Sequence, residues 1–291
     1  MQDALTGTVI AAHGRRFLVG ADDGTVHDCV VRGKRADLAC GDRVSFRMTG
    51  AAGGVIEATL PRSSLLQRAA FHRRKLIAAN LTQVAVLVAA EPSFFDELVA
   101  RVLVAAEDLQ LACLIILNKI DLPAVGFARE QLAPFKAAGY RIVEISARAD
   151  VSALRSLLVG HRTAFLGQSG MGKSTIVNAL VPNAGAVTRE ISHFLDSGRH
   201  ATTASRLYHL DGDSDIIDCP GIQEFGLAHL DALRVANSFP ELRALVQRCR
   251  FNDCRHESEP DCAIKAAVAG GRFDPRRYAL LLRLLAGTRN P

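Results

Sequence analysis

The chain has 291 residues, a hydrophobic content of 49% and a formal net charge of +5. This length allows two or three domains with a real core, and the composition is that of a globular protein. No apolar run reaches the length of a membrane span, and the first residues lack the charged and apolar regions of a signal peptide. These features exclude a membrane-spanning protein, and we expect a cytoplasmic one.

Positive charge is concentrated at the two ends of the sequence. Residues 1–75 hold 12 Lys or Arg against 7 Asp or Glu, residues 76–240 hold 13 against 17, and residues 241–291 hold 10 against 6. Two basic flanks around a mildly acidic middle suggest that the ends contact a polyanion. Solvated surface charge explains the same pattern equally well.

The first sixty residues alternate short β-rich segments with turn signals such as Gly53-Gly54. The β-rich segments are residues 5–10, 17–19, 25–31, 43–46 and 55–59. About five strands in this length predict a small all-β barrel over residues 1–68, with the OB-fold and an SH3-like barrel as alternatives. Residues 62–75 read as a basic connector.

From about residue 80, strand-like and helix-like segments alternate. The predicted strands are residues 84–90, 114–117, 142–145, 163–166, 207–210 and 215–217, and the predicted helices are residues 97–109, 129–138 and 173–180. This alternation predicts an α/β domain with a parallel sheet over residues 69–235. Ligands of such sheets bind at the carboxyl ends of the strands.

A candidate guanine-reading motif follows strand 114–117. Asn118-Lys119-Ile120-Asp121 fits the N-K-x-D of a GTPase. The Asp121 carboxylate can accept hydrogen bonds from the N1–H and the 2-amino group of guanine, whereas adenine presents no such pair of donors. Alone, four letters are better explained by a solvated loop, but beside a phosphate loop they specify GTP. Ser146-Ala147 fits a second element, which offers a backbone N–H to the guanine O6.

A phosphate-binding loop lies between strand 163–166 and a helix, the context that the G-x-x-x-x-G-K-[ST] motif requires. Its glycines let backbone N–H groups turn toward the phosphates, and the helix points its positive end at them. We expect Lys173 to reach the β/γ oxygens and Ser174 to ligate Mg²⁺. The expected phosphate contacts are Gly167, Gln168, Ser169, Gly170, Met171, Gly172, Lys173, Ser174 and Thr175.

A third motif, Asp218-Cys219-Pro220-Gly221, closes strand 215–217 and fits the D-x-P-G sensor of a GTPase. Asp218 should hold Mg²⁺ through water, and Gly221 should offer its N–H to the γ-phosphate. Ile222 follows where many GTPases carry a water-orienting Gln, and Gln223 is one step off and should point elsewhere. Unassisted hydrolysis should therefore be slow, with the catalytic group supplied by another segment or by a partner.

The order of these motifs is permuted. In an ordinary GTPase the N-K-x-D motif comes last, whereas in this chain it precedes the phosphate loop. The sequence therefore predicts a circularly permuted GTPase domain.

Three of the seven cysteines lie within 14 residues near the C-terminus. Cys249, Cys254 and Cys262, together with His256, supply three thiolates and one imidazole, a set that suits a closed tetrahedral Zn²⁺ site. Buried cysteines beside a surface histidine are the alternative. Few large apolar residues surround the cluster, so bound metal should stabilise a mainly helical domain over residues 236–291.

The segment Gly198-Arg199-His200-Ala201-Thr202-Thr203 resembles the G-R-H-T-T-T switch of the ribosome small subunit-dependent GTPase A family. The permuted motif order, the basic N-terminal barrel and the spacing of the four cluster residues agree with this resemblance, which covers nearly the whole chain. Ala201 replaces the usual Thr, and Met171 replaces the usual small aliphatic residue of the phosphate loop.

The resemblance implies a GTPase that uses GTP, GDP, Mg²⁺ and one structural Zn²⁺. It implies docking on the small (30S) ribosomal subunit and its rRNA late in subunit maturation, with hydrolysis stimulated by that subunit. By matching position, His200 is the candidate catalytic group, and Thr202 or Thr203 is the switch residue that contacts Mg²⁺. We expect a monomer without a membrane partner. Arg73-Arg74-Lys75 is either an rRNA contact or a solvated run.

Two rival functions stay open at this point. One is a permuted GTPase that acts on the large subunit or on another RNA. The other is a non-hydrolysing RNA-binding scaffold with a vestigial nucleotide pocket, and the intact Lys173, Ser174 and Asp218 argue against it.

Overall fold

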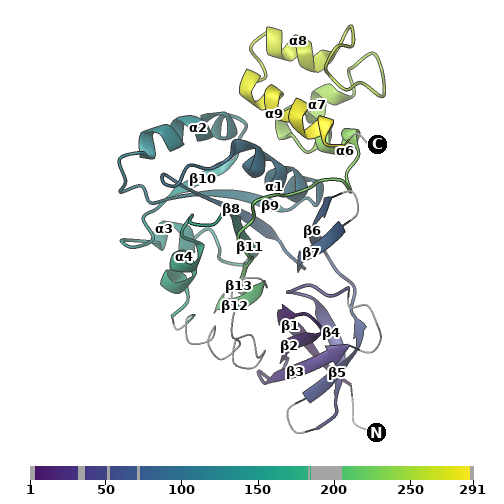
Figure 1. The fold of residues 1–291 in the computed structure, drawn as a ribbon, viewed down its shortest axis with the longest axis vertical. Coiled ribbons are helices and arrows are strands. Elements are labelled where there is room, and N and C mark those ends of the chain that lie inside the picture. The colour runs from purple at the N-terminus through teal and green to yellow at the C-terminus, as the bar shows by residue number, and fades with distance from the viewer. Residues whose placement is uncertain are drawn as a thin grey trace.

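The structure is a computed structural model, and it describes residues 4–31, 37–50, 53–70, 73–182, 184 and 205–288. The expected switch segment, residues 198–203, lies outside the described residues, and with it lie His200, Thr202 and Thr203. A β-barrel and a group of helices occupy opposite ends of the molecule, with an α/β part between them (Figure 1). In the portion described, no helix combines the length and the apolar character that crossing a bilayer requires.

Five strands close into the N-terminal barrel. They are β1 (Leu5–His13), β2 (Arg16–Ala21), β3 (Val26–Val31), β4 (Arg43–Met48) and β5 (Gly53–Thr59). The hydrogen-bonded order is β1-β2-β3-β5-β4, and β4 pairs with β1 to complete the circle. Alternate residues such as Val9, Val19, Val44 and Phe46 point inward and form a separate small core. The barrel is OB-like, which settles the alternative left open by the sequence.

A β-hairpin follows the barrel where the sequence predicts only a basic connector. Strands β6 (Leu65–Ala70) and β7 (Arg73–Ala79) pair antiparallel in a sheet of their own. Leu66, Ile77 and Ala78 are buried, while Arg74 and Lys75 are exposed. The burial along β7 does not alternate, because the neighbouring residues Arg74 and Lys75 are both exposed and the neighbouring residues Ile77 and Ala78 are both buried. The strand therefore lacks the two-residue pattern by which a half-buried strand is recognised in a sequence.

The central sheet carries the motifs. Its strands are β8 (Gln83–Ala89), β9 (Ala112–Asn118), β10 (Arg141–Glu144), β11 (Arg162–Gly167), β12 (Arg206–Asp211) and β13 (Ser214–Asp218). Their order is β10-β9-β8-β11-β13-β12, and every neighbouring pair is parallel except β13 with β12. Every residue of β8 is buried, which explains its unbroken apolar run.

Helices cover this sheet and connect its strands. They are α1 (Asp96–Asp108), α2 (Val125–Ala137), α3 (Ser152–Arg155) and α4 (Lys173–Leu180). Apolar residues occupy most of the circumference of α1, because it packs on β8 and β9 on one side and on C-terminal helices on the other.

The C-terminal helices extend the core of the central part. They are α6 (Ala232–Asn237), α7 (Arg243–Val246), α8 (Ala263–Ala269) and α9 (Pro275–Ala286), with a 3₁₀ turn at Pro240–Leu242. Asp274 caps α9 by accepting hydrogen bonds from the N–H groups of Arg276 and Arg277. Buried residues of α9, including Leu281 and Leu284, belong to the same apolar cluster as the central sheet.

The barrel and the central sheet are joined edge to edge. Ala11 of β1 pairs with Arg206 of β12, so that the strands of both parts form one continuous hydrogen-bonded sheet. Next to this junction, the Arg162 guanidinium donates to the Gly41 carbonyl over 3.3 Å. The sequence predicts the two units but not this connection, because the pairing residues are far apart in the chain.

Candidate nucleotide-binding site and metal cluster

The loops after β9, β11 and β13 surround one cavity of about 460 Å³ at the carboxyl end of the sheet. Asp121 and Lys173, which belong to different motifs, both line it. The predicted site residues that line this cavity are Asn118, Lys119, Asp121, Ser146, Ala147, Gln168, Ser169, Gly170, Gly172, Lys173, Ser174, Thr175 and Gly221. The permuted motifs therefore converge in space.

Four predicted residues do not line the cavity but support its walls. Gly167 is buried at the end of β11, and a Cβ there would lie 2.5 Å from the Leu87 carbonyl oxygen, so only glycine fits beside β8. Met171 is also buried, and Ile120 donates its N–H to the Ile145 carbonyl over 3.3 Å. The fourth, Asp218, contacts the phosphate-loop lysine.

The phosphate loop has the backbone conformation that glycine permits. Gly170 and Gly172 have φ values of +85° and +90°. A Cβ on Gly172 would lie 2.3 Å from the amide nitrogen of Asn118, which comes from the base-reading motif. Helix α4 begins immediately afterwards at Lys173, so its positive N-terminal end faces the cavity.

Lys173 and Asp218 form an ion pair at the floor of the site. The ammonium nitrogen lies 2.6 Å from the carboxylate Oδ1, and the Lys173 side chain is only 9% exposed. A nearly buried ammonium needs a negative partner, and Asp218 supplies it here. These are the two groups that the motifs assign to the phosphate oxygens and to Mg²⁺, so a bound nucleotide and its metal would take over both charges.

Asn118 connects the two base-side elements to the phosphate loop. Its amide nitrogen donates to the Met171 carbonyl over 3.0 Å, and its Oδ1 accepts from the Ala147 N–H over 3.0 Å. The same Ala147 N–H is the one expected at guanine O6, so a base contact from Ala147 would share it. Lys119 donates to the carbonyls of Glu91 and Gly170 over 2.7 and 2.9 Å. These bonds fix the base-reading loop against the phosphate loop.

Asp121 is exposed at the mouth of the cavity and stays ionised. The Ser146 hydroxyl donates a hydrogen bond to its carboxylate, which lowers the pKa of Asp121 below its ordinary value. An ionised carboxylate is the acceptor that the N1–H and 2-amino groups of guanine require. The sequence analysis considered only the backbone of this element, and the structure adds the Ser146 hydroxyl beside Asp121.

Among the described residues, the segment after Asp218 brings no water-orienting side chain into the cavity. Ile222 is 5% exposed and donates its N–H to the Gly167 carbonyl over 3.0 Å, so its side chain stays in the core. Gln223 lines a different groove, next to Phe95 at the start of α1. Neither residue lines the nucleotide cavity, as expected from the sequence, whereas Gly221 does.

Two residues that the sequence analysis missed also line the cavity. Leu122 follows Asp121 directly, and Arg148 follows Ala147 directly. Each lies one position beyond a recognised motif, so extending the two motifs by a residue would have found them. The guanidinium of Arg148 adds a positive charge on the base side.

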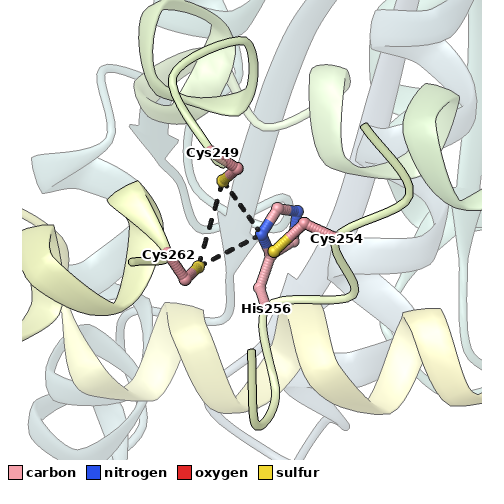
Figure 2. Close-up of side chains that lie close together, drawn as sticks. All are labelled: Cys249, Cys254, His256 and Cys262. Atoms are coloured by element: carbon pink, nitrogen blue, oxygen red, sulfur yellow. Dashed lines mark hydrogen bonds between the residues drawn. The ribbon is translucent and has the colours of Figure 1, made fainter. Parts of the chain in front are cut away.

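The C-terminal cysteines and histidine form a compact cluster, and Figure 2 shows the four side chains directed toward one another. All four ligand atoms lie within 4.8 Å of each other. The Cys249 and Cys262 sulfurs are 4.0 Å apart, and His256 Nδ1 lies 3.6 and 3.4 Å from them. A tetrahedral ion with Zn–S bonds of about 2.3 Å would hold its sulfurs about 3.8 Å apart. The donor set and its spacing therefore fit Zn²⁺.

The backbone of the cluster loop supports this interpretation. His256 has a φ of +63°, a left-handed conformation that costs a non-glycine residue about 1–2 kcal/mol. Its carbonyl accepts a hydrogen bond from the Tyr278 hydroxyl of α9. A strained backbone conformation persists where the surrounding structure holds it in place, and such residues are common at ligand-binding sites. A left-handed conformation at His256 is therefore consistent with metal ligation by this residue.

Comparison with known proteins agrees with this geometry. A family model described as RsgA GTPase matches residues 59–228. A Small ribosomal subunit biogenesis GTPase RsgA from Burkholderia pseudomallei (strain K96243) is 50% identical over 285 residues, which cover 96% of this chain and 91% of the relative. The protein of the same description from Nitrosospira multiformis is 49% identical over 283 residues, covering 97% and 90%.

Solved structures show the same fold. YjeQ from Thermotoga maritima superposes with a TM-score of 0.74 at 26% identity, covering 99% of this chain and all (100%) of that one. YloQ, described as a circularly permuted GTPase, superposes with a TM-score of 0.71 at 24% identity, covering 99% and 97%. With the three motifs around one cavity, half of its residues shared with such relatives and the whole fold in common, this chain belongs to the RsgA GTPase family.

Proposed function

We propose that this GTPase binds the small ribosomal subunit, assists its late maturation, and hydrolyses GTP in response to that subunit. The observation that carries the proposal is the convergence of permuted GTPase motifs on one cavity, in a chain 50% identical to a protein named for small-subunit biogenesis. Action on ribosomal subunits would place the chain in the cytoplasm.

The cavity residues suit a guanine nucleotide. Asp121, held by Ser146, accepts the two donors of the guanine edge. The backbone N–H groups of the phosphate loop and the N-terminus of α4 face the phosphates. An adenine base presents no such pair of donors, so it would not form the two hydrogen bonds that guanine forms with Asp121.

The lower part of the cavity suits Mg²⁺ and the terminal phosphates. Lys173 would release Asp218 and bind the β/γ oxygens, while Ser174 and Asp218 would hold the metal. Mg²⁺ neutralises the charge that develops on the phosphate oxygens during transfer. Gly221 would present its N–H to the γ-phosphate.

Hydrolysis needs a group that the described cavity walls do not supply. Ile222 is buried and Gln223 lines another groove, so neither can orient the attacking water. We propose His200 as the catalytic group, Thr202 or Thr203 as the Mg²⁺ contact, and docking on the subunit as the event that brings the histidine into position. This division predicts slow unassisted turnover and stimulation by the partner.

The cluster of Cys249, Cys254, His256 and Cys262 would hold one structural Zn²⁺. All four corners of the tetrahedron are taken by protein ligands, so the metal would act by stabilising the loop rather than by binding substrate. Zinc would offset the backbone strain at His256 and fix the surface between α7 and α8.

The rRNA contacts are proposed for the basic flanks. Several barrel arginines form ion pairs within the barrel, namely Arg16 with Asp28, Arg43 with Asp22, Arg47 with Glu57 and Arg62 with Asp42. Arg74 and Lys75 are exposed on the hairpin, and we propose them as phosphate contacts, with Arg73 beside them in the chain. We further propose that the chain acts as a monomer of three units, residues 1–68, 69–235 and 236–291.

The test is GTP turnover by the full chain with and without purified small subunits. We expect slow turnover alone and strong stimulation by small subunits. Lys173→Ala should abolish turnover both with and without small subunits, whereas His200→Ala should remove turnover but retain nucleotide binding. If large subunits or free RNA stimulated turnover and small subunits did not, that partner would be the one on which the GTPase acts. Turnover that survives Lys173→Ala would show that the cavity is not the active site.

A further inference from the structure

The loop of residues 219–222 separates two cavities. Gly221 lines the nucleotide cavity and also a second cavity of about 260 Å³ on the other side of the loop. The second cavity is lined by Arg68 and Lys75 from the β6–β7 hairpin and by Cys40 from the barrel. Residues 219–222, called the wall below, therefore lie between the nucleotide cavity and the cavity next to the hairpin and the barrel.

The two ends of this wall are tied to the strand of the phosphate loop. The Cys219 N–H donates to the Phe165 carbonyl over 3.3 Å, and the Ile222 N–H donates to the Gly167 carbonyl over 3.0 Å. Beyond Ile222 the chain leaves β11, so its path there depends on other contacts.

The hairpin provides those contacts. The Arg68 guanidinium donates to the Glu224 carbonyl over 3.0 Å. The Ala69 N–H donates to the Gly226 carbonyl over 2.9 Å, and the Ala228 N–H donates to the Ala69 carbonyl over 3.1 Å. The segment after the wall thus runs alongside β6 as a short parallel partner.

The hairpin is also fastened to the barrel, and Figure 1 shows it beside the central sheet, between the barrel and the C-terminal helices. The Ala79 N–H of β7 donates to the Cys40 carbonyl over 2.8 Å. The Asn80 amide donates to the Gly41 carbonyl over 2.9 Å. A continuous chain of hydrogen bonds therefore leads from the barrel through the hairpin to the segment that follows Gly221.

We infer that Arg68 is a positioning residue of the GTPase centre. Together with the backbone of Ala69, it fixes the segment after Gly221 from the outside, so that the Gly221 N–H faces the γ-phosphate. This inference rests on the proposed function, which assigns the γ-phosphate to Gly221. GDP has no γ-phosphate, so Arg68 supports the binding and hydrolysis of GTP without supporting GDP. Through the same hydrogen bonds, a displacement of the barrel would be transmitted to the segment that contacts the nucleotide.

The experiment compares Arg68→Met with Arg129→Met in the full chain. Arg129 lies on α2, and its exposed side chain pairs with Glu144 of β10 rather than with the segment after Gly221. The measurements are the affinity for GDP, the affinity for a non-hydrolysable GTP analogue, and the single-turnover rate of GTP hydrolysis. Hydrogen exchange of residues 223–230 reports the positioning directly.

For Arg68→Met we expect about a fivefold loss of affinity for the GTP analogue, corresponding to one hydrogen bond. We expect a slower single turnover, faster exchange at residues 223–230, and an unchanged affinity for GDP. Arg129→Met should leave all four quantities unchanged. Arg68→Lys keeps the charge and one donor, so it should fall between the wild type and Arg68→Met.

Equal losses of GDP and GTP-analogue affinity would overturn the inference, because they would indicate general loosening of the fold. Identical behaviour of Arg68→Met and Arg129→Met would overturn it as well. Neither outcome depends on ribosomal subunits. The proposed function fails by a different result, namely turnover that persists in Lys173→Ala or that subunits do not stimulate.

Discussion

Arg277 allows a demanding test of how the C-terminal helices are held to the GTPase core. Its side chain is 2% exposed, and its guanidinium lies over three rings, 4.5 Å from Phe239, 5.1 Å from Phe135 and 5.6 Å from Tyr140. Its Nε donates to Glu241 Oε1 over 2.8 Å. Glu241 Oε2 is buried and lacks a hydrogen-bond partner within the described part of the chain. Removing the cation would leave this carboxylate without its counter-charge.

Arg277→Met keeps the apolar stem and removes the charge. Breaking a buried ion pair by deleting one partner costs about 3–5 kcal/mol. Loss of a desolvated cation–π contact contributes up to about 2 kcal/mol, part of which the Met side chain recovers by packing on the same rings. We therefore expect a loss of about 3–5 kcal/mol, a large share of the 5–15 kcal/mol that stabilises a typical domain.

The assay is urea unfolding followed by far-UV circular dichroism, since the chain contains no tryptophan. Arg250→Met is the matched control. Arg250 also stacks on a ring, that of Phe251, and pairs with an acid, Asp261, but the two charged side chains are 62% and 69% exposed. It should cost less than about 1 kcal/mol. Equal small losses in both variants would refute the reasoning that burial makes the Arg277 contacts strong.

Three further changes probe the nucleotide site and the metal cluster. Asp121→Asn replaces a carboxylate oxygen, which accepts hydrogen bonds, by an amide group, which donates them. The affinity for GDP should therefore fall by roughly 100-fold, while the affinity for a xanthine nucleotide rises. Unchanged guanine selectivity in a fluorescent-nucleotide titration would contradict the assignment. Gly172→Ala places a methyl group 2.3 Å from the Asn118 amide nitrogen, at a φ of +90° that alanine rarely adopts. Isothermal titration calorimetry should show that nucleotide binding is lost. Gly126→Ala is the control, because a methyl group there meets open space, and this variant should bind nucleotide normally. Cys254→Ser should release zinc and speed hydrogen exchange in the cluster loop while α9 stays protected; full protection of the loop without metal would argue against a structural site.

The convergence of the three motifs on one cavity could be predicted from the sequence because each motif is local. A strand, a glycine-rich loop and a helix N-terminus follow one another in the chain, so their relative positions are set by short-range geometry. The parallel sheet then brings strand ends to one edge, which places Asp121 near Lys173 without further information. The metal cluster is predictable for the same reason, since its four ligands lie within 14 residues.

Features that depend on distant partners were not predictable. The β6–β7 hairpin pairs with residues near Gly226, and nothing in the basic run of residues 62–75 identifies that partner. Arg277 follows Arg276 in the sequence and reads as part of a solvated charged run. Its burial depends on the rings of Phe135 in α2, Tyr140 just before β10 and Phe239 in the turn after α6, and these meet only in the folded protein.

The permuted strand order also bears on how the chain emerges during its own synthesis. The strands β8, β9 and β10 are contiguous in the sequence and pair side by side, so the base-reading edge is released complete before the phosphate loop has been translated. Until then, the Asn118 amide lacks the Met171 carbonyl that it binds in the finished protein. The barrel strand β1 is likewise synthesised well before β12, the strand through which it joins the large sheet. The nascent chain thus carries the base-reading half of the site until residues 167–175 follow, and α9, which packs on α1, is added later still.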